Sequence, residues 1–391
     1  MSPLPVRHQS GSARAVVVGA SIGGLTTAEM LRHEGWDGEI VLVGDEPHPP
    51  YNRPPLSKQV LMGDWEPEQA TVRTATELDA LEIQLRTGCP ATGLDVGARV
   101  LHTADGPIAF DELVVATGSS PRPHPLLPDA LTLRTVPEAL ALREALAVAG
   151  DVAIIGAGIL GAEIASAARK HGVATTLVGI EDRLGFGSVG TLLSDRLAVL
   201  HAAHDVELLL RTEVVHADGT TLTFGDGAVR SFSLVVVMIG ARPNVDWLEG
   251  SALEIGNGVL CDSTGLAAPG VHAVGDVAAW EDPVTGRHVR VEHQSNAIEQ
   301  AVAVAARIVH GATGERPVPL FWSEVHGTRI NAYGWFDPTI PLVGEPDAAV
   351  LTSTDAEGRV RGVVGWNAPT REFRAARAAV STSHHVEGAA R

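Results

Sequence analysis

The chain has 391 residues, of which 45% are hydrophobic and 19% are charged. This balance is typical of a globular protein with two or three domains, and it excludes disorder over most of the length. The formal net charge of −18 argues against non-specific binding to nucleic acid or to an anionic membrane, because either needs a basic surface.

The cysteines and histidines give no sign of a metal site or of a redox-active disulfide. Cys89 and Cys261 are far apart and form no Cys-x-x-Cys pair, so we expect two buried, unreactive thiols. Histidine pairs such as His201 and His204 lack a complete ligand set, so we expect no metal. No apolar run reaches the ~18 residues of a membrane span, and residues 1–12 lack the apolar core of a signal peptide. We therefore expect a cytoplasmic protein.

Residues 14–31 combine a β-branched run, a glycine-rich turn and a helical pattern. Gly19 allows the tight turn, Gly24 allows close packing of strand and helix, and a helix beginning near Ser21 directs its N–H groups at phosphates. A second strand over 39–43 ends just before Asp45, where a carboxylate is expected to hold an adenosine ribose. The pattern predicts a dinucleotide site, and the alternative is a glycine-rich turn that binds nothing.

The same pattern begins again at residue 151. A complete G-x-G-x-x-G motif, made by Gly156, Gly158 and Gly161, directly follows a strand and opens a helix that runs towards residue 171. Two such motifs predict two bound dinucleotides, because each builds one pyrophosphate site. The second strand of this repeat, over 174–178, ends at Gly179 instead of at an acidic residue.

Several shorter segments are consistent with cofactor binding. Consecutive prolines within 50–58 exclude an ordinary helix, and we expect a rigid loop that brings Arg53 and Lys58 to one place, with a plain surface crossover as the alternative. Residues 83–117 alternate as strands, with a hairpin turn at 103–106, and end before Gly118. The run 234–240 shows the same pattern, an apolar strand that ends at a glycine. A short strand then leads to Asp276, which could accept hydrogen bonds from sugar hydroxyls or cap a helix.

The order of these motifs resembles the FAD-dependent, NAD(P)H-oxidising ferredoxin reductases of bacterial oxygenase and P450 systems, the putidaredoxin reductase and biphenyl dioxygenase reductase type. The resemblance covers about residues 14–376. It rests on a first glycine motif, Arg-Pro-Pro-Leu-Ser-Lys, Ala-Thr-Gly, a second glycine motif, Gly-Ala-Arg-Pro-Asn, Val-Gly-Asp and Phe-Trp-Ser, in that order.

The resemblance implies an α/β fold with two Rossmann-like dinucleotide-binding domains, for FAD and NAD(P), and a small α+β C-terminal domain. We expect a flexible N-terminus, 1–13, a discontinuous FAD-binding domain, 14–121 and 245–318, and an NAD(P)-binding domain, 122–244. A C-terminal domain, 319–378, and a flexible tail, 379–391, complete the division. A helical pattern over 296–310 and antiparallel segments from the aromatic strand 321–323 up to residue 366 agree with it.

The resemblance also implies the residues of both sites. The FAD site is expected to include Gly19, Ala20, Ser21, Gly23, Gly24, Asp45, Arg53, Lys58, Ala91, Ala116, Gly118, Arg134, Gly275, Asp276, His293 and Gln294. The NAD(P) site is expected to include Gly156, Gly158, Ile159, Gly161, Glu163, Glu181, Arg183 and Gly240.

Three side chains are implied to act in the reaction: Lys58, Glu163 and Trp322. By the resemblance, Lys58 stands near the flavin N5, Glu163 pairs with it and meets the nicotinamide amide, and Trp322 lies against the flavin and nicotinamide. An ammonium beside reduced flavin stabilises its negative charge, and a carboxylate partner positions the lysine and moderates its field. Hydride transfer needs no protein acid or base, so we expect positioning and electrostatic roles.

The chain departs from the family pattern where the second nucleotide binds. Gly179 replaces the acidic residue that such enzymes use for the NADH ribose, and Gly187 stands where an arginine is common. Glu181 could still reach the ribose, or Arg183 could accept a 2′-phosphate. The choice between NADH and NADPH therefore stays open.

The expected partner is a [2Fe–2S] ferredoxin that binds transiently, and the expected oligomeric state is a monomer or a homodimer. Because ferredoxins are usually acidic, docking is expected to use basic groups such as Arg290, Arg316 and Arg329. Gln294 and His326 stand where related enzymes often have other residues, including aromatic ones. Two alternatives remain: an FAD-dependent oxidase or small-molecule oxidoreductase that does not use ferredoxin, and a flavin-binding redox sensor or interaction protein.

Overall fold

The computed structural model describes residues 13–185, 187–283, 285–311, 318–337, 340, 342–345 and 347–388. The flexible N-terminus expected over 1–13 lies outside them, apart from residue 13. The chain folds into two compact units, 13–52, 71–120 and 242–311 in the first, and 53–70, 121–241 and 318–388 in the second. The strands β8 (Ser119–Pro121) and β16 (Ala241–Pro243) lie where the chain passes between the units. The expected boundaries of the domains stay a prediction.

The first unit is built on a six-stranded sheet with the order β19-β20-β7-β1-β2-β3. Neighbouring strands are parallel except β19 and β20. The central strands are runs of valine, leucine and isoleucine that are buried, which is typical of a parallel sheet covered on both faces. The strands are β1 (Arg14–Val18), β2 (Glu39–Val43), β3 (Ile83–Arg86), β7 (Glu112–Val115), β19 (Leu266–Ala268) and β20 (Val271–Ala273). The strands expected from the first glycine motif are confirmed.

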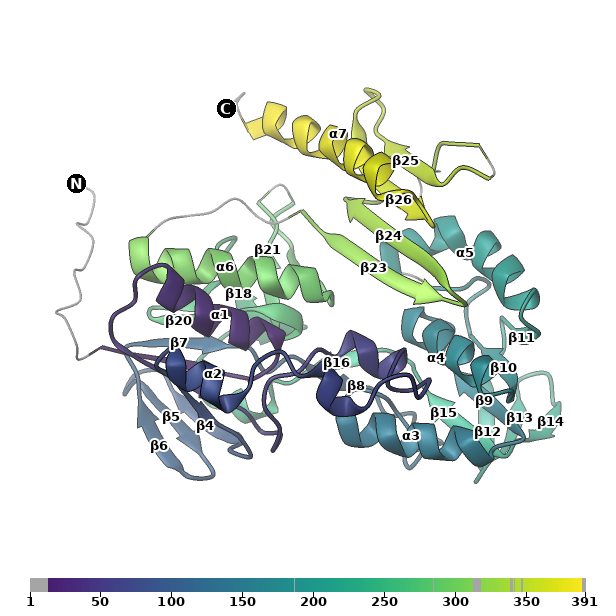
Figure 1. The fold of residues 1–391 in the computed structure, drawn as a ribbon, viewed down its shortest axis with the longest axis horizontal. Coiled ribbons are helices and arrows are strands. Elements are labelled where there is room, and N and C mark those ends of the chain that lie inside the picture. Colours follow the sequence, from purple (N-terminus) through teal and green to yellow (C-terminus); the bar gives the residue numbers. More distant parts are fainter. Residues whose placement is uncertain are drawn as a thin grey trace. The chain divides into compact units, whose positions relative to one another are not determined.

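Helices and two small sheets complete the first unit. The helices α1 (Ile22–His33) and α6 (Gln294–His310) pack side by side (Figure 1), and α2 (Ala75–Ala80) precedes β3. An antiparallel sheet contains β4 (Ala91–Asp95), β5 (Val100–Thr103) and β6 (Gly106–Ala109), which confirms the expected hairpin turn. A second sheet contains β17 (Ile255–Gly256), β18 (Gly258–Cys261), β21 (Ala278–Glu281) and β22 (His288–Arg290). The 3₁₀ helix η3 (Asp246–Leu248) precedes β17 in the sequence, and the 3₁₀ helix η4 (Gly275–Val277) directly precedes β21.

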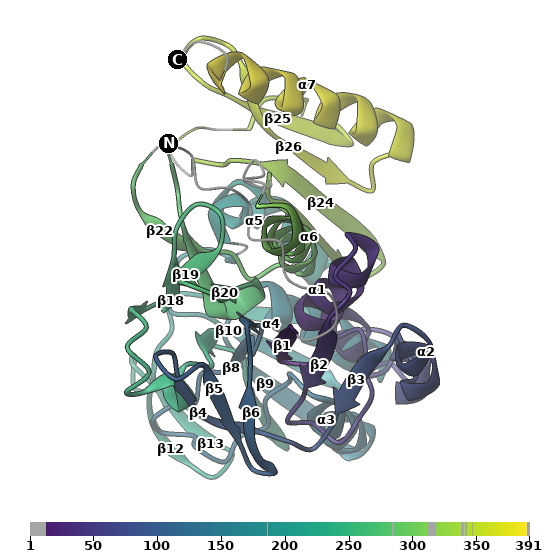
Figure 2. The ribbon, with the colours of Figure 1, turned by 90° about the vertical axis from the view of Figure 1, so that its left-hand side faces the viewer.

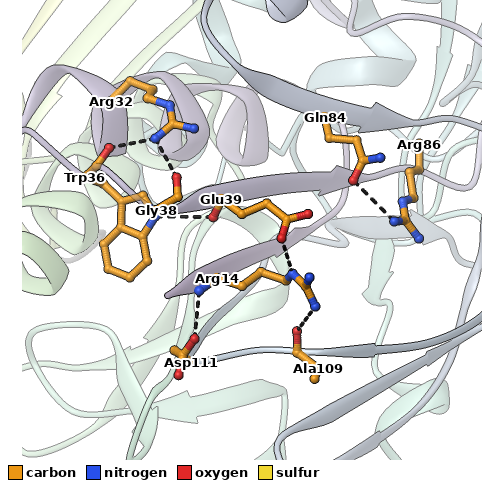
Figure 3. A network of polar contacts seen from close by, with 9 residues as sticks. All are labelled: Arg14, Arg32, Trp36, Gly38, Glu39, Gln84, Arg86, Ala109 and Asp111. Carbon is orange, nitrogen blue, oxygen red and sulfur yellow. Dashed lines mark hydrogen bonds and ion pairs between the residues drawn. The ribbon is translucent and has the colours of Figure 1, made fainter. Parts of the chain in front are cut away.

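A polar network joins the start of β1 to its neighbours (Figure 3). The backbone N–H of Arg14 donates to Asp111 Oδ2 at 2.7 Å, and the guanidinium of Arg14 donates to Glu39 Oε2 at 2.7 Å and to the carbonyl of Ala109 at 3.0 Å. In the last turn of α1, Arg32 donates to the carbonyls of Trp36 and Gly38, each at 2.7 Å. These contacts fix the strand and the helix that flank the first glycine turn.

The second unit repeats the parallel arrangement. Its sheet has the order β11-β10-β9-β15, with β9 (Asp151–Ile155), β10 (Ala174–Val178), β11 (Val206–Leu209) and β15 (Leu234–Val237). The helices are α3 (Val136–Val148), α4 (Ile159–Lys170) and α5 (Gly187–Ala202), and a small antiparallel sheet contains β12 (Val214–Asp218), β13 (Thr221–Phe224) and β14 (Val229–Ser231). The strands and the helix expected around the second glycine motif are confirmed.

The proline-rich segment 50–58 contains no α-helix, as the sequence predicts, but part of it is a short 3₁₀ helix and not a loop. It contains a 3₁₀ helix, η1 (Pro54–Ser57), followed by η2 (Pro67–Ala70). Two prolines fit the first turn of a helix because the first N–H groups there have no intrahelical acceptor. The correction is local, since the segment still ends at Lys58.

The C-terminal part of the second unit contains an antiparallel sheet, as expected from the alternating pattern. Its strand order is β23-β24-β26-β25. It contains β23 (Leu320–Val325), β24 (Thr328–Gly334), β25 (Val350–Thr354) and β26 (Val360–Trp366), and α7 (Thr370–Gly388) packs along it (Figures 1 and 2). Helix α7 therefore occupies most of the range 379–391, for which the sequence suggests a tail. No helix in the described part of the chain combines the length and the apolar character needed to cross a bilayer.

Candidate functional site

The first glycine turn leaves space and hydrogen-bond donors for a phosphate group. Gly19 has a φ of +115°, and a Cβ there would lie 2.2 Å from the carbonyl oxygen of Ala116. A Cβ on Gly24 would lie 1.9 Å from the carbonyl oxygen of Gly19, so the strand and the helix touch at this point. Ser21 precedes α1 without a side-chain cap, so the first N–H groups of the helix stay available to an anion.

The second glycine turn repeats this geometry. Gly156 has a φ of +119°, and its Cβ would lie 2.1 Å from the carbonyl oxygen of Met238. A Cβ on Gly161 would lie 2.0 Å from the carbonyl oxygen of Gly156, and Gly158 precedes α4 without a cap. Both turns therefore fit the pyrophosphate of a dinucleotide.

The two repeats also match directly after their second strands, where Gly44 follows β2 and Gly179 follows β10. A Cβ on Gly44 would lie 2.7 Å from the Cβ of Ala20, and a Cβ on Gly179 would lie 2.7 Å from the Cβ of Ala157. Each glycine therefore makes room for the alanine inside the neighbouring glycine motif. Gly179 is the structural counterpart of Gly44, and any side chain at this position, acidic or not, would meet the Cβ of Ala157.

The residues that follow Gly44 and Gly179 differ in polarity. Asp45 follows Gly44, whereas Ile180, with 71% of its surface exposed, follows Gly179. The backbone N–H of Arg211 donates to the carbonyl of Glu181 at 2.8 Å, and Asp182 lies 3.3 Å from the guanidinium of Arg211. The carboxylates near the end of β10 are therefore those of Glu181 and Asp182.

Several residues expected to bind FAD meet in the first unit. Ser119 donates to Asp276 Oδ2 at 3.1 Å, and Val274, rather than Asp276, precedes η4 as its N-cap. Gln294 Nε2 donates to Asn52 Oδ1 at 2.7 Å, while Gln294 Oε1 is buried without a hydrogen-bond partner among the described residues. A buried acceptor without a donor is the kind of group that a ligand satisfies.

The N-terminus of α6 brings a histidine to the same region. His293 is its N-cap residue, and burial lowers the pKa of His293 while the carboxylate of Asp276 opposes this effect. A neutral imidazole next to the positive end of a helix is compatible with a polar, uncharged ligand group. The backbone and side chains of this unit thus fit FAD at the turn and at the start of α6.

Three residues expected to bind FAD belong to the second unit: Arg53, Lys58 and Arg134. The guanidinium of Arg53 donates to the carbonyl of Arg134 at 2.7 Å. The backbone of Arg134 in turn donates to Glu138, which caps the start of α3. The structure therefore brings Arg53 and Arg134 together.

Lys58 and Glu163 form a buried ion pair in the second unit. Lys58 Nζ lies 2.7 Å from Glu163 Oε1, and each residue is only 5% exposed. Trp322 lies with its ring centroid 5.1 Å from Lys58 Nζ, at cation–π distance. A buried ion pair tolerates the loss of either partner poorly, because the remaining charge has no counterion.

Two serines complete this cluster, and the sequence did not single them out. Ser57 Oγ donates to Glu163 Oε2 at 2.5 Å, and Ser323 Oγ donates to Glu163 Oε1 at 2.6 Å. Both serines stand inside motifs that the sequence shows, one before Lys58 and one after Trp322. No local pattern predicts their contact with Glu163, since they are 106 and 160 residues away from it.

Three histidines meet at the turn between β23 and β24: His326 lies in the turn, His201 lies on α5, and His204 lies just after α5. His326 Nε2 lies 3.1 Å from His201 Nδ1, and the ring of His204 stacks on His326 at 4.1 Å between centroids. Burial and the neighbouring histidines lower the pKa of His201 to about 4 and that of His326 to about 3. The backbone of His326 donates to Ser166 on α4 at 2.8 Å. His326 therefore fixes the turn against α4 and α5.

The thiols do not offer a route for electrons. Cys89 and Cys261 are both buried and free, as the sequence predicts. Burial raises the pKa of Cys261 to about 12, so the reactive thiolate is scarce at neutral pH. A thiol–disulfide step would need an accessible cysteine of low pKa.

Two dinucleotide turns and a buried lysine–glutamate pair define an oxidoreductase that uses a nucleotide cofactor. Residues 13–301 match the family model of the pyridine nucleotide-disulphide oxidoreductases. The chain belongs to this family, and the expected α/β fold class is confirmed.

Known relatives are similar over nearly the whole chain. Rhodocoxin reductase of Rhodococcus erythropolis is 35% identical, with 94% of this chain and 89% of that protein covered. The ferredoxin reductase component of chlorobenzene dioxygenase from Cupriavidus sp. (strain PS12) is 34% identical, with 97% and 95% covered. A covalent complex of putidaredoxin reductase with putidaredoxin contains a chain with a TM-score of 0.88 at 28% identity, with 95% of this chain and 94% of that chain covered. The resemblance seen in the motifs is thereby confirmed.

Proposed function

We propose that this protein is a flavoprotein reductase that takes electrons from NAD(P)H through FAD and passes them to a [2Fe–2S] ferredoxin serving an oxygenase or a P450. The observation that carries the proposal is the pair of matching dinucleotide turns at Gly19 and Gly156, in a chain whose relatives include ferredoxin reductase components of dioxygenase systems. When bound, FAD supplies the conversion between the two-electron chemistry of nicotinamide and the one-electron chemistry of an iron–sulfur centre.

The glycine turns and the ends of the parallel strands bind the cofactors in this proposal. The first unit holds FAD through the turn at Gly19, the carboxylate of Asp45 and the start of α6. The second unit holds the nicotinamide nucleotide through the turn at Gly156 and the residues that follow β10. The uncapped helix ends support both assignments, because each presents N–H donors to a pyrophosphate.

Lys58, Glu163 and Trp322 act by position and charge. Lys58 provides the positive charge that favours an anionic reduced flavin, and Glu163 orients the lysine and the nicotinamide amide, as the family resemblance implies. The 2.7 Å ion pair and the tryptophan ring at 5.1 Å support this assignment by showing a lysine whose position is set on two sides. Neither charge has to gain or lose a proton for the reaction.

The buried thiols favour electron exit to an external one-electron acceptor. Within the described residues, the two cysteines are buried and Cys261 resists ionisation, which disfavours the internal disulfide route that the family name suggests. Relatives that are ferredoxin reductases of dioxygenase systems support a ferredoxin as this acceptor. A transient complex fits a shuttling carrier, and the choice between monomer and homodimer stays open. Because NAD(P)H is a cytoplasmic reductant, we propose a cytoplasmic location.

The docking residues expected from the sequence need a correction. Arg290 is not a surface group, because its side chain is 8% exposed, pairs with Glu292 and donates to the carbonyl of Asp276. Arg316 lies outside the described residues, and Arg329 is exposed. Of the three arginines, Arg329 therefore remains a docking candidate.

Anaerobic titration of the purified protein with NADH and, separately, with NADPH tests the proposal. Loss of the flavin absorbance on addition of one nucleotide is the expected result, and it also decides the nucleotide preference. If dithionite bleaches the flavin and neither nucleotide does, the reductase function is wrong, and an oxidase with an organic donor or a sensing role becomes the better account.

A further inference from the structure

The carboxylate of Glu163 is held by three donors from two separate segments of the second unit. Lys58 comes directly after η1, Ser57 ends η1, and Ser323 lies on β23, while Glu163 itself lies on α4. The distances to the carboxylate oxygens are 2.7 Å from Lys58 Nζ, 2.5 Å from Ser57 Oγ and 2.6 Å from Ser323 Oγ. Both carboxylate oxygens therefore have a hydroxyl donor in addition to the ion pair.

The two serines make different contacts within the cluster. Ser57 Oγ also lies 3.4 Å from Lys58 Nζ, so Ser57 accepts from the ammonium and donates to the carboxylate. Ser323 is 0% exposed and binds the oxygen that Lys58 shares. Hydroxyls stabilise a buried anion without adding charge, and leaving such an anion short of donors is costly. The orientation of Glu163 is thus fixed by groups that leave the net charge of the cluster at zero.

Ser323 also links this cluster to the C-terminal sheet. It follows Trp322, whose ring lies at cation–π distance from Lys58. The turn directly after β23 makes a second contact with α4, through His326 and Ser166. Glu163 and Ser166 are three residues apart on α4, as are Ser323 and His326 at the end of β23. The two pairs form a short ladder that aligns the strand with the helix.

We propose that Ser57 and Ser323 are positioning residues for the reaction: they hold the carboxylate of Glu163 in one orientation and, through it, the ammonium of Lys58. This inference rests on the proposed function, because it treats Lys58 and Glu163 as the charges that the flavin and the nicotinamide meet. It predicts that the loss of either hydroxyl leaves the net charge of the cluster unchanged but alters the orientation of the Glu163 carboxylate and the Lys58 ammonium.

The composition of the chain allows a direct observation of Lys58. The chain contains only two lysines, Lys58 and Lys170. Lys58 is buried, whereas Lys170 pairs with Asp64 at the surface with a side chain that is 48% exposed. In the NMR spectrum of protein labelled with ¹⁵Nζ-lysine, the ammonium of Lys58 should give a signal whose protons are protected from exchange with solvent. The exposed Lys170 serves as the internal reference. Lys170→Arg assigns the signals.

The variants are Ser57→Ala and Ser323→Ala, with Ser57→Thr and Ser323→Thr to restore the hydroxyl. Ser353→Ala is the matched control, because Ser353 is 1% exposed on β25 and its hydroxyl has no hydrogen-bond partner among the described residues. In the alanine variants we expect the Lys58 signal to shift and to lose protection, and the Ser353→Ala spectrum to match that of the parent protein. If an alanine variant fails to fold, the cysteine variant at the same position, Ser57→Cys or Ser323→Cys, is measured instead.

Anaerobic stopped-flow mixing with the nucleotide provides the functional readout. Each alanine variant should lower the limiting rate of flavin bleaching by about ten-fold, the effect of one hydrogen bond to a charged group, with little change in the nucleotide concentration at half-saturation. The threonine variants should recover most of the rate. An unchanged Lys58 signal and rate in both alanine variants would overturn the inference. Failure of the proposed function would look different, since neither nucleotide would bleach even the parent protein.

Discussion

Replacing Gly179 by alanine or glutamate tests whether packing, and not loss of nucleotide recognition, explains this position. A Cβ on Gly179 would lie 2.7 Å from the Cβ of Ala157, well inside ordinary contact. Overpacking of this kind typically costs about 1–3 kcal/mol of folding free energy. Gly179→Ala should therefore destabilise the protein by that amount, although alanine adds only one methyl group.

A second substitution should remove the clash. Ala157→Gly takes away the atom that the new Cβ meets, so the double variants Ala157→Gly/Gly179→Ala and Ala157→Gly/Gly179→Glu should be more stable than the corresponding single variants at Gly179. The glutamate in the double variant then stands at the end of β10, where the family resemblance implies an acidic residue for the ribose. We expect a KM for NADH about ten-fold lower than in Ala157→Gly alone, the effect of one charged hydrogen bond.

Thermal unfolding and steady-state kinetics with NADH and NADPH measure both effects. Gly185→Ala is the control, because the nearest atom to a Cβ there is 3.9 Å away, and the melting temperature should stay within error. If Gly179→Ala proves as stable as the parent protein, or if Ala157→Gly fails to improve Gly179→Glu, the packing explanation is refuted.

Three further predictions concern charge. Lys58→Ala should slow flavin reduction markedly while Lys170→Ala does not, and equal rates in stopped-flow reduction would remove Lys58 from the mechanism. The folded state keeps His201 neutral, with its pKa lowered from 6.5 to about 4, whereas the unfolded chain takes up a proton below pH 6.5. Stability should therefore fall between pH 6.5 and 4, by at most about 3 kcal/mol from this residue, and melting curves of His201→Asn should fall less steeply with decreasing pH. A slope equal to that of the parent protein would contradict this account. Arg329→Glu should weaken ferredoxin reduction and its salt dependence, and identical salt curves would exclude Arg329 from docking.

The local patterns of the sequence predict most of the fold. Strand, glycine turn and helix come in one continuous stretch at Gly19 and again at Gly156, so periodicity and turn chemistry are sufficient there. The hairpin at 103–106 and the C-terminal antiparallel sheet follow from alternation alone. The 3₁₀ helix η1 was not predicted, because prolines that exclude a regular helix still fit the first turn of a short one.

The candidate site depends more on distant contacts, which the sequence does not show. The serines around Glu163 come from segments more than a hundred residues away, and the space that Gly179 leaves for Ala157 is visible only in three dimensions. Arg290 looks like a surface cation in the sequence but is buried against Glu292 and Asp276. Pairing of this kind is decided by tertiary packing, and residue type alone does not predict it.

The most direct test of the central claim is electron transfer to a ferredoxin without oxygen. The protein is first reduced with NADH or NADPH and then mixed in a stopped-flow instrument with an oxidised [2Fe–2S] ferredoxin, while the flavin and iron–sulfur absorbances are followed together. The account predicts that the flavin is reoxidised as the ferredoxin is reduced, with one reduced ferredoxin for each electron supplied. A flavin that is reduced by the nucleotide but stays reduced with every [2Fe–2S] ferredoxin, and is reoxidised only by oxygen or an organic acceptor, would contradict it.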